Sequence, residues 1–160
     1  MSSVNPGLTH TAAEVNSAAI HLLRALRAVD RQSGLTPARL SALSVLVFSG
    51  PCTLGRLARI EDVAGPTMTR IVDGLCGLKL VRREPHPDSA RAVRIVATAD
   101  GERVMRAAAQ RRTKAIIAGL RALPESDTAR IEATAPALAS LAIEVAKALA
   151  QTGSTQDPWK

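Results

Sequence analysis

Apolar residues recur every three or four positions along much of the chain, which is the spacing of helices that bury one face. The first such stretch predicts a helix over residues 12–31. Thr36 and Pro37 then supply an N-cap hydroxyl and a proline at the first helical position, so a second helix is expected to end at Leu46 or Phe48. The chain is therefore predicted to open with two helices.

Two short helices joined by a tight turn are predicted next. Thr53 caps the first of them, over residues 54–61, and the second begins near Pro66. Its apolar stripe consists of Met68, Ile71, Val72, Leu75 and Leu78. Its other face exposes Thr67, Thr69, Arg70 and Asp73. Two such helices form a helix-turn-helix, in which the second helix enters the major groove of DNA.

A β-hairpin is predicted after this pair of helices. Residues 80–84 and 92–98 both have the pattern of extended strands. We expect residues 85–91 to form a polar loop with a basic tip, because Pro85 and Pro87 should preclude a strand or helix there. A hairpin beside a helix-turn-helix is the arrangement called a wing.

Two longer helices are predicted to complete the fold. Thr98 caps one over residues 99–123. Ser126 or Asp127 is expected to cap the last helix, which Pro136 should kink or split. The apolar stripe of the last helix consists of Ile131, Leu138, Leu141, Val145 and Leu149.

The composition indicates one domain with a basic surface. A length of 160 residues fits a single folding unit. Within it, residues 151–160 are expected to form a flexible tail with Trp159 exposed. The net charge of +7 suits a polyanionic partner, and the basic excess lies in the first two thirds of the chain. A solvated surface explains the same basic excess, so the sequence motifs must distinguish a polyanionic partner from a solvated surface.

Three stretches of sequence, in this order of predicted elements, resemble the MarR family of winged helix-turn-helix transcriptional regulators. SGLTPARLSALSVL is similar to the second helix of that family, PTMTRIVDGLCGLKLVRRE to its recognition helix and first wing strand, and RAVRIVATADGERV to its return strand and long helix. The resemblance spans residues 12–149. Each stretch alone is a loose match, and the order and spacing make the set specific.

The resemblance implies which residues meet DNA. Pro66, Thr67, Thr69 and Arg70 match recognition-helix positions that contact bases and phosphates, and Arg91 matches the wing-tip arginine that enters the minor groove. The expected DNA-binding set is Thr53, Gly65, Pro66, Thr67, Thr69, Arg70 and Arg91.

Two positions depart from the family pattern. Ser89 stands where the family often has an acidic residue that braces the wing arginine, with Asp88 beside it. Ala64 and Gly65 replace a capping serine, and glycine caps a helix acceptably without supplying a side-chain acceptor.

The resemblance further implies a mainly α fold with a small hairpin wing and dimerisation helices at both ends. Residues 12–31 and 99–150 would form the dimerisation region, and residues 36–98 the DNA-binding lobe. A homodimer of this kind presents two recognition helices to a pseudo-palindrome of double-stranded DNA, with half-sites about 10 base pairs apart. It is expected to act as a cytoplasmic repressor, released by a small-molecule effector of unknown identity.

Two alternatives stay open. Cys52 and Cys76 are redox candidates, although neither has an activating base nearby in the sequence. The second alternative is a helical dimer that has lost DNA binding and binds proteins.

Other classes of function lack their motifs. His10, His21 and His86 are scattered, so we expect no metal site. There is no catalytic motif, so we expect neither an enzyme nor a cofactor. No signal peptide or membrane span is indicated, so we expect no membrane partner.

Overall fold

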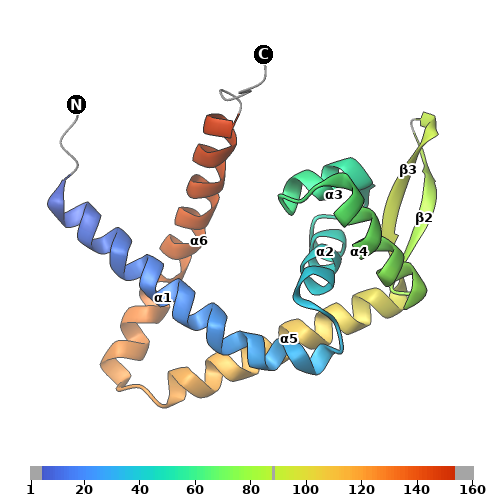
Figure 1. The fold of residues 1–160 in the computed structure, drawn as a ribbon. Helices are drawn as coiled ribbons and strands as arrows, with labels where there is room; N and C mark the ends of the chain where they lie inside the picture. The colour runs from blue at the N-terminus through green and yellow to red at the C-terminus, as the bar shows by residue number, and fades with distance from the viewer. Residues whose placement is uncertain (1–4, 88, 154–160) are drawn as a thin grey trace. The chain divides into compact units, whose positions relative to one another are not determined.

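The computed structural model describes residues 5–87 and 89–153, without the side chains of residues 89–91, 150, 152 and 153 (Figure 1). The elements are α1 (Pro6–Asp30), the 3-10 helix η1 (Arg31–Ser33), α2 (Pro37–Phe48), β1 (Cys52–Thr53), α3 (Leu54–Ile60), α4 (Gly65–Gly77), β2 (Val81–His86), β3 (Ser89–Ala97), α5 (Ala99–Arg121) and α6 (Glu125–Gly153). They fall into two compact units, residues 1–115 and 116–160.

The core of the first unit lies where α2, α3 and α4 meet the sheet and the start of α5. Its largest fully buried side chains are Leu43, Leu57, Met68, Val72, Leu75 and Ile95. The predicted stripe of α4 is confirmed at Met68, Val72 and Leu75. It is wrong at Leu78, which follows the end of α4 and is 49% exposed. This core fixes α4 from one side only and leaves its other side to solvent.

The sheet has three antiparallel strands in the order β1-β3-β2. The predicted loop over residues 85–91 is wrong, because Pro85 pairs with Val93 and His86 pairs with Ser89. Pro85 is tolerated because β2 is an edge strand, where the missing N–H costs no ladder bond, and the register shifts between Pro85 and His86. The wing is therefore a longer hairpin than the sequence indicated.

Side-chain caps fix the start of several helices. The hydroxyl oxygens of Thr36 and Thr53 accept from the backbone N–H groups of Arg39 and Arg56 at 3.4 and 3.3 Å, as predicted. The first helix begins six residues earlier than predicted, because the Asn5 side chain accepts from Gly7 N at 3.0 Å and a proline occupies the first turn.

The beginning of α5 is tied to the beginning of β2. As predicted, Thr98 caps α5: its hydroxyl oxygen accepts from Gly101 N at 3.1 Å, and the same hydroxyl donates to Lys79 O at 2.8 Å. Gly101 lies directly against the carbonyl oxygen of Leu80, where a Cβ would collide. This close approach holds the first wing strand against the long helix.

The second unit consists mainly of α6. Neither predicted cap starts it, because Asp127 N and Thr128 N both donate to the backbone oxygen of Pro124, at 3.0 and 3.1 Å. Pro136 does not split the helix, which continues to Gly153 and includes three residues expected in the tail. Trp159 lies outside the described residues.

The exposed large apolar side chains of α6 are Ile131, Leu138, Leu141, Ile143, Val145 and Leu149. Across the part of the chain that the structure describes, no helix combines the length and the apolar composition that crossing a membrane requires.

Candidate nucleic-acid interface

The turn between α3 and α4 sets where the second helix of the motif begins. Asp62 adopts a positive φ of 50°, and Val63 N donates to Ala58 O at 3.0 Å, which closes the turn over the end of α3. Ala64 is the N-cap of α4 and Gly65 its first residue, so Gly65 is not the cap that the sequence suggested. No side chain caps this helix, so its first N–H groups stay free to bind phosphate.

The outward face of α4 carries part of the expected DNA-binding set. Pro66, Thr67 and Arg70 are exposed, and Thr67 and Arg70 lie three positions apart on one face. Thr69 is half-buried, and its hydroxyl donates to Gly65 O at 3.0 Å. Thr53 is half-buried as well, with its oxygen engaged in capping α3. Thr67 and Arg70 are thus the polar side chains of this face that have no bonding partner among the described residues.

Two arginines of the wing, Arg82 and Arg94, share one carboxylate. Glu84 binds Arg82 at 2.7 Å and Arg94 at 3.1 Å. The hydrogen bond from Arg82 lowers the pKa of Glu84 below its ordinary value, and Arg94 adds to the effect. Among the described residues, Arg70 makes no salt bridge. Its charge is therefore available to a phosphate or a base.

A second ion pair connects the wing to the recognition helix. Arg83 Nη2 on β2 lies 2.7 Å from Asp73 Oδ1 on α4. The hydrogen bond raises the pKa of Arg83 further above its ordinary value. Sequence reasoning did not find this brace, because the partners lie ten positions apart on different elements.

Arg91 belongs to β3, not to a loop. Its side chain lies outside the described residues, as do Asp88 and the side chain of Ser89. Its entry into the minor groove and the missing acidic brace therefore stay predictions.

The two cysteines occupy different surroundings. Cys52 is buried in β1, and burial raises the pKa of its thiol. Cys76 is half-buried on α4. A raised pKa keeps the Cys52 thiol protonated at neutral pH, which opposes the reactivity expected of a redox sensor. No cluster of three or more metal-ligating side chains occurs in the described ranges.

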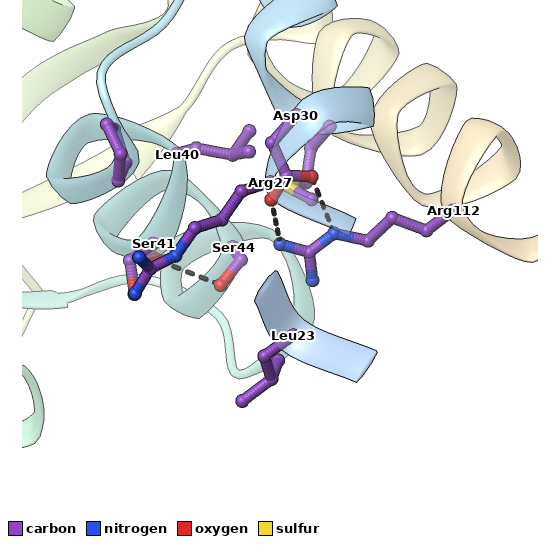
Figure 2. A pocket seen from close by; sticks show the side chains of 9 residues that line it. Leu23, Arg27, Asp30, Leu40, Ser41, Ser44 and Arg112 are labelled. Atoms are coloured by element: carbon purple, nitrogen blue, oxygen red, sulfur yellow. Dashed lines mark hydrogen bonds and ion pairs between the residues drawn. The ribbon is translucent and has the colours of Figure 1, made fainter. Parts of the chain in front are cut away.

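A pocket of about 250 Å³ lies between α1, α2 and α5 within the first unit (Figure 2). It is lined by Leu23, Arg27, Asp30, Pro37, Leu40, Ser41, Ser44, Met105 and Arg112. Two nitrogens of the Arg112 guanidinium donate to the two oxygens of Asp30 at 2.6 Å each, and this bonding raises the pKa of Arg112. Arg27 makes no salt bridge within the described part of the chain. The pocket thus combines apolar walls, hydroxyls and an unpaired cation.

The two short helices with an exposed second helix, followed by a hairpin, define the class of winged helix-turn-helix regulators. A family model described as MarR family matches residues 33–92. The HTH-type transcriptional regulator ML2140 of Mycobacterium leprae is 35% identical over 70% of this chain and 78% of its own length. Mb0904 of Mycobacterium bovis, also an HTH-type transcriptional regulator, is 31% identical over 83% and 93%.

Solved structures share the fold. Tm0710 of Thermotoga maritima, a transcriptional regulator, has a TM-score of 0.68 and 25% identity, over 92% of this chain and 99% of its own. A MarR family protein of Bacillus stearothermophilus has a TM-score of 0.74 and 23% identity, over 90% and 99%. NadR in complex with 4-hydroxyphenylacetate has a TM-score of 0.60 and 19% identity, over 87% and 96%.

The chain belongs to the MarR family of transcriptional regulators. Proteins of this family bind DNA and are not enzymes. The predictions of family and fold class are thereby confirmed.

Proposed function

We propose that the protein is a repressor that binds a pseudo-palindromic operator as a homodimer. The observation that carries the proposal is the outer face of α4, where Thr67 and Arg70 are exposed and no side chain caps the helix. Arg70 has no carboxylate partner among the described residues, so it can donate two hydrogen bonds to a guanine in the major groove. The proposal includes the other expected contacts, Thr53, Gly65, Pro66, Thr69 and Arg91.

The apolar surface of α6 supports the homodimer. The side chains of Ile131, Leu138, Leu141 and Val145 are 40–49% exposed. At 3.6 residues per turn they share one face of the helix, and water contact with such a stripe is unfavourable. The first helix, α1, also exposes leucines and an isoleucine. A second copy of the chain would cover these residues about a two-fold axis and set two α4 helices about one DNA turn apart.

The pocket between α1, α2 and α5 supports release by a small molecule. Its volume of about 250 Å³ suits a compact ligand. Arg27 offers an unpaired cation and Ser41 and Ser44 offer hydroxyls, which together suit an acid with an apolar body. NadR, which shares the fold, was solved with 4-hydroxyphenylacetate, an acid of this kind.

Because the proposed partner is DNA, we propose that the protein acts in the cytoplasm. An interaction module without DNA binding is the alternative, because the same exposed apolar residues could bind another protein. Peroxide sensing is disfavoured by the raised pKa of Cys52.

The experiment that tests the proposal is footprinting on the DNA upstream of the protein's own gene, followed by affinity measurements on the protected segment. We expect two protected half-sites about 10 base pairs apart, centre to centre. The affinity should fall steeply as salt rises, because binding releases counterions from the phosphates. Scrambled DNA of the same length and composition is the control, and equal affinity for both sequences at every salt concentration would contradict the proposal.

A further inference from the structure

Ser41 faces both the pocket and the turn of the DNA-binding motif. It lines the pocket between α1, α2 and α5, where Figure 2 shows it beside Ser44. Its hydroxyl donates to Glu61 Oε1 at 3.1 Å. Glu61 is the C-cap of α3 and the first residue of the turn that leads to α4. One short side chain thus reaches from the pocket wall to the turn.

The other hydrogen bonds of the turn come from its own backbone. The backbone of Glu61, Asp62 and Val63 donates back to the oxygens of α3, and the start of α4 has no side-chain cap. Asp62 holds a positive φ of 50°, which is unfavourable for a residue with a side chain. In the described part of the chain, the bond from Ser41 is the side-chain hydrogen bond that joins α2 to this turn.

We infer that Ser41 is a positioning residue for DNA recognition, which holds the turn through Glu61 and releases it when a pocket ligand accepts its hydrogen bond instead. A serine hydroxyl has a single hydrogen to donate. An acceptor on a ligand that bonds to Ser41 therefore removes the donor from Glu61, and α4 loses a constraint on where it begins. This inference rests on the proposed function and names how occupation of the pocket reaches α4.

Ser44 provides a matched control on the same pocket wall. Its hydroxyl donates to the backbone oxygen of Ser41 at 2.7 Å and makes no bond to the turn. Ser44→Ala therefore removes a pocket hydroxyl one helical turn away without removing the donor to Glu61. If pocket polarity alone mattered, both serine variants would behave alike.

The test is a double-mutant cycle on affinity for the footprinted operator, without any ligand. We expect Ser41→Ala to weaken operator binding about two- to tenfold, the range that a single net hydrogen bond allows. In a Glu61→Ala background the same substitution should have no effect, because the acceptor is gone. Ser44→Ala should bind like the wild type, and all variants should keep the wild-type affinity for scrambled DNA.

Two results would overturn the inference, and a third would remove its basis. Ser41→Ala could leave operator affinity unchanged, or weaken it equally with and without Glu61; either outcome shows that the bond does not position α4 while leaving the regulator proposal intact. A wild-type protein that does not prefer its operator over scrambled DNA refutes the proposed function, and the inference with it.

Discussion

A side chain has no room at position 101. A Cβ added to Gly101 would collide with the backbone oxygen of Leu80 and lie 3.3 Å from a methyl carbon of Leu43, so it would push α5 away from the wing strand. Gly119 lies on the same helix with no atom within 4 Å of an added Cβ. Alanine substitutions at the two positions therefore distinguish the cost of crowding from the gain in helix propensity.

We predict that Gly101→Ala destabilises the protein by about 1–3 kcal/mol, the usual cost of overpacking. Gly119→Ala should stabilise it by up to about 1 kcal/mol, because alanine is the better helix former. Urea unfolding followed by circular dichroism measures both. If Gly101→Ala were as stable as the wild type, the close approach of α5 to Leu80 would not exist in solution.

Whether the bond of a single residue could be predicted from the sequence depends on how far its partner lies along the chain. The caps at Thr36, Thr53 and Thr98 could be predicted because each hydroxyl bonds to a backbone N–H three residues later. The bonds from Arg83 to Asp73 and from Ser41 to Glu61 could not. Their partners lie ten and twenty positions apart, and only the packing of one element on another brings them together.

At the scale of elements, the wing shows how a local rule was overridden. Pro85 and Pro87 predicted a loop, yet Pro85 pairs with Val93 because it lies on the edge strand β2. Whether a strand lies at an edge is a property of the sheet and cannot be read from the strand's own residues. On the same strand, Arg83 lies within reach of Asp73 on α4, which ties the angle of the wing to the recognition helix.

The brace between wing and helix leads to a prediction about cooperation between the two elements. Asp73→Ala and Arg83→Ala should each weaken operator binding a few-fold, and the double variant should be no weaker than Arg83→Ala alone. The coupling should stay below about 1 kcal/mol, because both side chains are about half exposed and solvent screens the pair. A cycle of operator affinities measures it, and fully additive losses would show that the brace does not position the wing.

At the scale of the whole molecule, the central prediction is a homodimer built on the stripe of α6. Leu141→Asp should convert the dimer to a monomer, because it places a charge in the middle of the apolar contact. Lys147→Asp is the matched control, since it changes charge on the same helix away from the stripe. Analytical ultracentrifugation distinguishes the two states. The proposed assembly would be contradicted if both variants remained dimers, or if the wild-type protein were a monomer.

The measurement that tests the account most directly is the effect of Arg70→Ala on the ratio of operator affinity to scrambled-DNA affinity. Arg106→Ala on α5 is the control, because Arg106 is also exposed but forms an ion pair with Glu102 on its own helix, 3.7 Å away. We predict that the ratio falls about tenfold or more for Arg70→Ala, as expected when a bidentate base contact is lost, and stays unchanged for Arg106→Ala. An unchanged ratio for Arg70→Ala would contradict the claim that the outer face of α4 reads the operator.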